Sequence, residues 1–136
     1  MIEKSNKIKE RSFDFALSII KLYSELKKYS EIVLLKQLLR SGTSIGANVH
    51  EASAASSKRD FLNKMAIASK EARETEYWLK LISESNLISF DFKPFLLEIN
   101  ELRASLKIVI LNDQPRRLGG SEESQLCLFE RKRRFP

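Results

Sequence analysis

The chain has 136 residues, 43% hydrophobic and 31% charged, which is the size and composition of one ordinary globular domain and argues against wholesale disorder. No run approaches the roughly 20 apolar residues of a membrane span, and the charged start MIEKSNKIKERS lacks the apolar core of a signal peptide. The lone Cys127 excludes an internal disulfide and a cysteine-built zinc site, so we expect a cytoplasmic protein. The net charge of +6 and pI near 9.5 favour an anionic partner, nucleic acid first, although such a charge also serves solubility alone.

Four glycines and three prolines are too few for a many-stranded fold. A first helix is predicted from about Ser12, a plausible N-cap, to Lys28. It has two apolar stripes, one through Phe13, Leu17, Ile20 and Tyr23 and the other through Ala16, Ile19 and Leu26. This breadth indicates burial on more than one side.

A second helix is predicted from near Ser30 to about Ser56. Its apolar stripe takes steps of 3, 4, 3, 4 and 3 through Leu35, Leu38, Gly42, Ile45, Val49 and Ala52. Gly42 and Gly46 lie one turn apart, and each costs about 1 kcal/mol of helix stability relative to alanine. Close approach of another helix would compensate for this cost, and a simple kink is the alternative.

A third helix is predicted to follow the capping-box-like Ser57-Lys58-Arg59-Asp60 and to end near Ser85. The cleanest heptad pattern of the chain predicts its core face: Phe61, Met65, Ala68, Ala72, Thr75, Leu79 and Ile82. A fourth helix should begin at Pro94 and end near Asn112. We therefore expect an all-α, antiparallel up-down four-helix bundle over residues 1–112. Residues 113–136, which carry Pro115, Gly119-Gly120 and a basic end, are expected to form a flexible basic tail.

A polar row runs beside the apolar stripe of the second helix, through Gln37, Ser41, Ser44, Asn48 and Glu51. Short hydrogen-bonding groups suit a partly dry contact with another subunit, and a solvated face is the alternative. Partners for this row could come from the third helix, through Arg73, Glu74 and Glu76.

The sequence offers little catalytic chemistry. His50 is the only histidine, Glu-x-x-His and His-Glu-x-x-His motifs are absent, and Arg40 lies ten residues from His50. A phosphate-binding loop and a nucleophile elbow are also missing. We therefore predict a non-enzymatic protein without catalytic residues, metal or cofactor.

Basic residues offer binding chemistry, because they can neutralise phosphates without reading bases. The candidate nucleic-acid-binding residues are Lys21, Lys27, Lys28, Lys36, Arg40, Lys58, Arg59, Lys64, Lys70 and Arg73. In the tail, Lys132, Arg133 and Arg134 beside Phe129 and Phe135 could add an arm that stacks on bases. For each cluster, a merely solvated face is the alternative.

Three segments, RSGTSIGANVHEA, SKRDFLNKMAIA and EARETEYWLKLI, have the order and spacing of a known family. With them the chain resembles the four-helix-bundle family of proteins encoded in intervening sequences of 23S ribosomal RNA. The resemblance covers residues 10 to 112. It implies a ring-like homopentamer with a basic surface, related to accessory variability proteins of retroelements that are associated with nucleic acid and a reverse transcriptase. No catalytic residues come with it.

The family motif positions carried over are Arg40, Ser44, Asn48, Glu51, Glu74 and Glu76. Except for Arg40, these residues are expected to serve assembly or packing, and so are Gly42 and Gly46. The resulting hypothesis is a homo-oligomeric bundle, a pentamer as the resemblance implies, that binds nucleic-acid backbones, RNA in preference to DNA. The alternative is a protein-interaction scaffold or adaptor for a nucleic-acid enzyme such as a reverse transcriptase.

Overall fold

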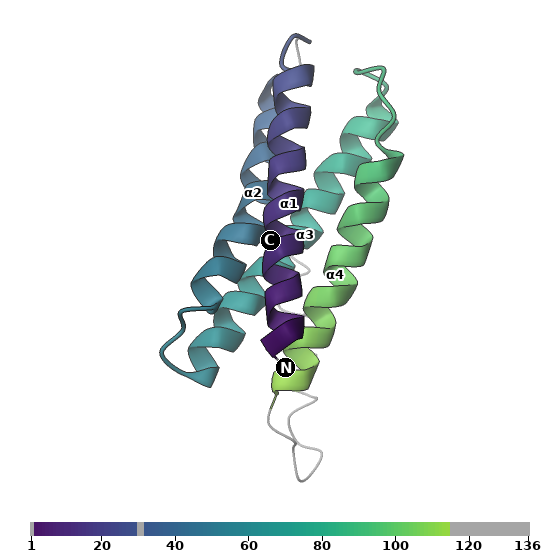
Figure 1. Cartoon of the computed structure of the whole chain (residues 1–136). Coiled ribbons are helices and arrows are strands. Elements are labelled where there is room, and N and C mark those ends of the chain that lie inside the picture. Colours follow the sequence, from purple (N-terminus) through teal and green to yellow (C-terminus); the bar gives the residue numbers. More distant parts are fainter. Residues whose placement is uncertain (1, 30–31, 115–136) are drawn as a thin grey trace, which may run out of the picture.

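The computed structural model describes residues 2–29 and 32–114, and the flexible basic tail predicted for 113–136 lies outside them from residue 115 onward. The described residues form four helices and no strand: α1 (Ile2–Leu26), α2 (Ile32–Ala52), α3 (Lys58–Ser85) and α4 (Lys93–Asp113). The helices lie side by side as a four-helix bundle (Figure 1). Each packs on its neighbour in the chain, and α4 returns to contact α1.

The first helix begins about ten residues earlier than predicted. Six of the ten residues 2–11 are lysine, glutamate or arginine, which are good helix formers and extend α1 toward the N-terminus. Ser12 is therefore a buried residue inside the helix, and its hydroxyl donates to the carbonyl of Lys9 at 3.0 Å. The proposed N-cap was wrong, because the hydroxyl is used one turn back along the helix.

The predicted Phe13 stripe of α1 faces outward rather than into the core. Phe13 is 62% exposed, and Leu17 and Ile20 are exposed too. The core face of α1 is made instead by Ile8, Phe15, Ile19, Leu22 and Leu26. Among residues 2–29 and 32–114, a large apolar stripe is thus left without a partner.

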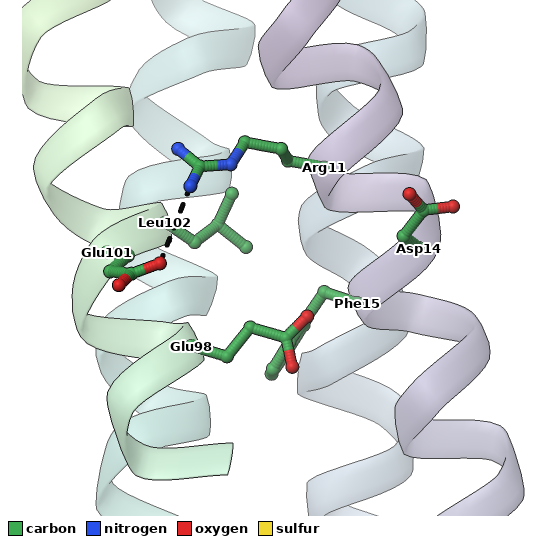
Figure 2. Close-up of a pocket in the computed structure, with 6 residues that line it drawn as sticks. All are labelled: Arg11, Asp14, Phe15, Glu98, Glu101 and Leu102. Carbon is green, nitrogen blue, oxygen red and sulfur yellow. Dashed lines mark hydrogen bonds and ion pairs between the residues drawn. The ribbon is translucent and has the colours of Figure 1, made fainter. Parts of the chain in front are cut away.

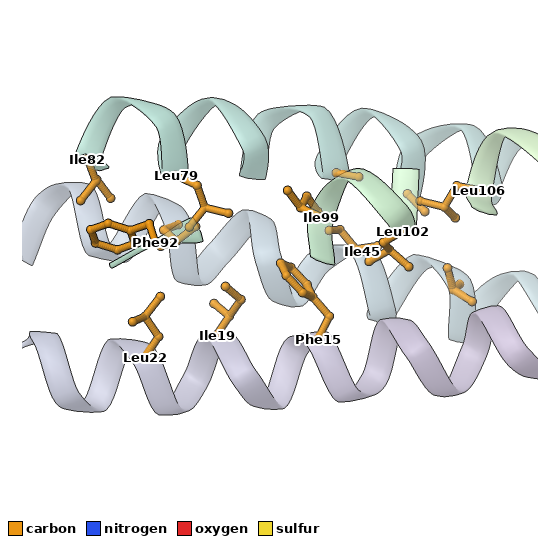
Figure 3. Packing of buried hydrophobic residues seen from close by; sticks show 14 of the residues in the cluster. Phe15, Ile19, Leu22, Ile45, Leu79, Ile82, Phe92, Ile99, Leu102 and Leu106 are labelled. Atoms are coloured by element: carbon orange, nitrogen blue, oxygen red, sulfur yellow. The ribbon is translucent and has the colours of Figure 1, made fainter. Parts of the chain in front are cut away.

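The core faces predicted for α2 and α3 are confirmed. Every member of the α2 stripe is buried, and so is every member of the α3 stripe except the half-buried Phe61. Figure 3 shows buried side chains of the four helices meeting along the bundle axis, among them Phe15, Ile45, Leu79, Ile99 and Leu106.

The ends of the helices follow from local chemistry. Ser57 caps α3, since its hydroxyl accepts a hydrogen bond from the amide of Asp60 at 3.0 Å. Asn86 ends the same helix in the left-handed conformation that asparagine tolerates. Pro94 lies in the first turn of α4, as predicted, and α4 reaches Asp113.

The second helix ends earlier than predicted, at Ala52 rather than Ser56. Beyond it the chain unwinds through tight backbone hydrogen bonds, from Ala54 to Glu51 at 3.1 Å and from Ala55 to Ala52 at 3.1 Å. The capping of α3 by Ser57 leaves little chain between the two helices. The predicted start at Ser30 lies outside the described residues.

Candidate functional site

The two glycines of α2 allow α1 to pack closely against it. A Cβ atom built at Gly46 would lie 3.1 Å from the backbone oxygen of Ser12, and one at Gly42 would lie 3.0 Å from two side-chain carbons of Ile19. The glycine pair is therefore used for close packing inside the subunit, and α2 is a regular helix through both positions. A kink is not needed to explain them.

The polar row of α2 lies on the other side of that helix, at the edge of its contact with α3. At 100° per residue, Asn48 lies about 160° away from Gly46, measured the shorter way around the helix. Glu51, at the end of the row, forms an ion pair with Lys64 of α3 at 2.8 Å. The row therefore runs along the α2–α3 side of the bundle.

Most of the polar row is satisfied within its own helix. Ser44 donates to the carbonyl of Arg40 at 2.7 Å, and Asn48 donates to the carbonyl of Ser44 at 2.8 Å. The buried Ser41 donates to the carbonyl of Leu38 at 3.3 Å. Only Glu51 reaches another helix in these contacts.

The acidic residues of α3 that were expected to pair with the polar row of α2 have other partners. Glu74 accepts a hydrogen bond from the indole of Trp78 at 3.3 Å. The side chain of Glu76 is only 13% exposed, and it pairs with Arg103 of α4 and with Lys80. Glu76 thus fastens α3 to α4 instead of facing α2.

The predicted basic residues do not form one patch. Lys27 and Lys28 follow the end of α1, whereas Lys58 and Arg59 begin α3 at the opposite end of α2. A helix of 21 residues separates these ends, which corresponds to about 30 Å. The other candidates are exposed on single helices, namely Lys21 on α1, Lys36 and Arg40 on α2, and Lys70 and Arg73 on α3, while the half-buried Lys64 is paired with Glu51.

One helix face gathers several of these cations. Steps of 4, 3, 4, 3, 4 and 3 lead along the exposed side of α3, opposite its core stripe, through Arg59, Asn63, Ala66, Lys70, Arg73, Tyr77 and Lys80. We call the chemically distinctive members, Arg59, Lys70, Arg73, Tyr77 and Lys80, the outer row of α3. The row extends over about 32 Å.

The outer row combines free cations with an aromatic ring. Within the described part of the chain, Arg59, Lys70 and Arg73 form no ion pair, whereas Lys80 is 3.0 Å from Glu76. Tyr77 is 57% exposed, and its ring stands edge-on to Trp78 with 5.1 Å between centroids. Such a row can neutralise phosphates and offer one ring for stacking.

Tyr77 and Lys80 were not among the binding residues predicted from the sequence. The heptad spacing that revealed the core of α3 also defines its opposite face, so continuing from Lys70 and Arg73 by steps of 4 and 3 would have found both. Acidic and basic residues are mixed around Tyr77 and Lys80, so the basic row is not obvious in the sequence.

A hollow lies between α1 and α4, and Figure 2 shows its lining. Arg11 reaches across it to Glu101 at 3.4 Å and to the hydroxyl of Ser105 at 3.1 Å. Burial raises the pKa of Glu98, and the neighbouring Glu101 and Asp14 raise it further. The hollow is therefore acidic despite Arg11.

No group of side chains able to hold a metal ion occurs among residues 2–29 and 32–114. His50, the sole histidine, is exposed in the last turn of α2. Within the same ranges, none of the four helices combines the length and apolar character that crossing a membrane requires.

The half-buried Glu71 of α3 has a raised pKa, and its effect on stability can be tested. Burial raises its pKa, Glu74 raises it further, and Lys70 and Arg40 oppose the shift. A carboxyl whose pKa is higher in the folded state loses stabilising free energy as the pH rises through that pKa. Glu71→Gln should therefore raise Tm at pH 7, and the gain should disappear as the pH falls below the ordinary glutamate pKa of about 4.3.

The measurement is thermal unfolding of the native chain and the variant across this pH range. Glu84→Gln, at an exposed position of the same helix, is the matched control and should leave Tm nearly unchanged. A gain for Glu71→Gln that is equally large at pH 3 would show that the carboxyl charge is not its cause.

The chain is a small all-α bundle protein of four packed helices. Glycines in α2 let α1 approach closely, and α3 has an exposed basic face. The chain belongs to the 23S rRNA-intervening sequence protein family, whose model matches residues 4–108. This confirms the resemblance drawn from the three sequence motifs.

A solved structure agrees with the fold. The crystal structure of a protein with unknown function from the S23 ribosomal protein family of Bacteroides thetaiotaomicron VPI-5482 is 44% identical to this chain, with a TM-score of 0.75. The similarity covers 79% of this chain and 97% of that one. The search of curated proteins finds no match.

Proposed function

We propose that this chain is a non-enzymatic, cytoplasmic, homo-oligomeric protein that binds RNA, in preference to DNA, through phosphate contacts made by the outer row of α3. The observation that carries the proposal is the alignment of Arg59, Lys70 and Arg73, which form no ion pair within the described residues, on one exposed helix face beside Tyr77. Contacts of this kind give affinity with little sequence preference. The family name, which refers to 23S rRNA, is consistent with an RNA partner.

The subunit is proposed to be an antiparallel up-down bundle. Helices that follow one another in the chain are neighbours in space, and the segment between α2 and α3 is short. Short connections between packed helices favour reversal of direction at each turn.

Binding can be tested by fluorescence anisotropy with a labelled single-stranded RNA of mixed sequence, about 20 nucleotides long, at low salt. We expect saturable binding that changes by less than about threefold when the sequence is scrambled at constant length, and weaker binding to DNA of the same sequence. Absence of binding at low salt would overturn the proposal.

The exposed stripe of α1 supports self-association. Phe13, Leu17 and Ile20 share one face, and large apolar stripes on soluble proteins commonly mark interaction surfaces. We propose that this face joins copies of the chain, and the family resemblance suggests five copies. The contact would bury side chains that the described part of the chain leaves exposed.

The double variant Phe13→Glu/Leu17→Glu should dissociate the assembly, because it places two charges in a contact that excludes water. Light scattering measures the mass, which should fall to that of one chain while helix content by circular dichroism is retained. Ile67→Glu, at an exposed apolar position of α3, is the control and should keep the mass of the native chain. A native chain that is already monomeric would contradict self-association.

A scaffold or adaptor function is the second candidate. Val33, near the start of α2, is 74% exposed, and Leu81, near the end of α3, is exposed as well. These side chains could contact a partner protein such as a nucleic-acid enzyme. A partner that stays bound in a pull-down after nuclease treatment supports this function, whereas one lost with the nucleic acid supports RNA binding.

A further inference from the structure

A groove between α1 and α4 contains two adjoining hollows of different character. The first is mostly apolar, and its lining includes Ile8, Ile108 and Val109. The second is the acidic hollow of Figure 2, whose lining includes Asp14 and Glu98. Arg11 lines both hollows and therefore lies where they meet.

The acidic hollow has more negative charge than its own cation can neutralise. Three carboxylates, Asp14, Glu98 and Glu101, line it together with one guanidinium, Arg11, which leaves a formal charge of −2. Arg11 is directed to Glu101, so Glu98 remains close to two other carboxylates. A basic ligand would relieve this repulsion.

The chain beyond α4 contains a segment with the matching order of side chains. Leu126-Cys127-Leu128-Phe129 is apolar, Glu130 is acidic, and Arg131-Lys132-Arg133-Arg134 is basic. The groove presents an apolar hollow, then Arg11, then an acidic hollow. Residues 105–109 of the apolar hollow are nearer the end of α4 than residues 98–102 of the acidic one, so a chain returning from that end meets them in this order.

The connection is long enough for this return. Residue 101 lies about 18 Å along the helix axis from Asp113, and the thirteen residues from Gln114 to Leu126 can extend over about 40 Å. A segment tethered this closely has an effective concentration in the millimolar range, which favours it over free peptides. Charge complementarity and tethering therefore select the same occupant.

We propose that residues 126–134 dock in the α1–α4 groove of their own subunit. The apolar residues occupy the hollow of Ile108 and Val109, Glu130 approaches Arg11, and the basic residues neutralise Asp14 and Glu98. The docked basic segment is then unavailable to nucleic acid until it is released. The docking itself does not depend on the proposed RNA binding.

The test is paramagnetic relaxation enhancement on the isotopically labelled full chain. A nitroxide is attached at Ser124→Cys in a Cys127→Ser background, so that the label lies just before the docking segment. The amides of Ile8, Ser105 and Val109 should lose intensity. The amide of Ile67, which lies on α3, should not.

Two variants separate docking from a general effect of the label. Asp14→Asn/Glu98→Gln removes the charges of the hollow, and replacement of all four basic residues 131–134 by glutamine leaves the bundle untouched. Each should reduce the relaxation enhancement at Ile8 and Val109 at least fivefold. The matched control Glu10→Gln/Glu84→Gln makes the same change in net charge at exposed positions outside the groove and should retain the enhancement.

The proposal is overturned if the groove amides are unaffected, or if their enhancement persists in both charge variants. It is also overturned if, in a mixture, a nitroxide-bearing chain without isotope broadens the groove of isotopically labelled chains as strongly as an attached label does. That result would assign the groove to the segment of another copy. A failure of RNA binding would leave all of these readouts unchanged, so the two proposals fail separately.

Discussion

Gly46→Leu is expected to lower the free energy of unfolding by about 1–3 kcal/mol or more, because the side chain has no space between α2 and α1. Even a Cβ would lie 3.1 Å from the carbonyl oxygen and 3.4 Å from the carbonyl carbon of Ser12. These are backbone atoms, so relief requires movement of α1 as a whole. The gain of about 1 kcal/mol in helix propensity cannot offset this displacement.

Urea denaturation followed by circular dichroism measures the effect. Ala47→Leu is the matched control, since Ala47 is the next residue of the same helix and is exposed. Its free energy of unfolding should stay within about 0.5 kcal/mol of the native value. Equal midpoints for Gly46→Leu and Ala47→Leu would contradict close packing at Gly46.

Removal of the free cations of the outer row should abolish most RNA affinity. The triple variant Arg59→Gln/Lys70→Gln/Arg73→Gln is expected to weaken binding about 10- to 150-fold, if each exposed ionic contact contributes about 0.5–1 kcal/mol. The loss should be similar for all RNA sequences, because phosphate contacts carry no sequence information. Anisotropy titrations at constant salt measure it.

The triple variant Lys21→Gln/Lys27→Gln/Lys28→Gln is the control for net charge. It removes the same charge from α1 and from the segment that follows it, outside the outer row. Its RNA affinity should remain within about threefold of the native value. If both triple variants lose affinity equally, net charge accounts for binding and the outer row does not form a site.

The sequence was sufficient for the helices whose two sides differ clearly in polarity. The α3 stripe and its Ser57 cap were predictable because heptad spacing and capping chemistry are local. For α1, two apolar stripes satisfied the same spacing, and only the positions of α2 and α4 decide which one is buried. The mistaken N-cap at Ser12 followed from starting the helix at its first apolar stripe, although the charged residues before it are good helix formers.

The partners of charged residues were the least predictable part of the candidate site. Glu76 meets Arg103 only because α3 and α4 pack in one particular register, and the sequence does not specify that register. The close approach at Gly42 and Gly46 was predictable from their spacing, whereas its partner, α1, was not. Likewise, the ten candidate cations looked alike in sequence, and the fold distributed them over different helices and ends of the bundle.

The salt dependence of RNA affinity tests the central claim most directly. We expect a plot of log K against log salt concentration, from about 50 to 200 mM, to have a slope of about −2 or steeper, since three neutralised phosphates each contribute about −0.7 on single strands. In the Arg59, Lys70 and Arg73 triple variant the slope should approach zero. A native chain whose RNA affinity does not change over this range would contradict phosphate binding by the outer row of α3.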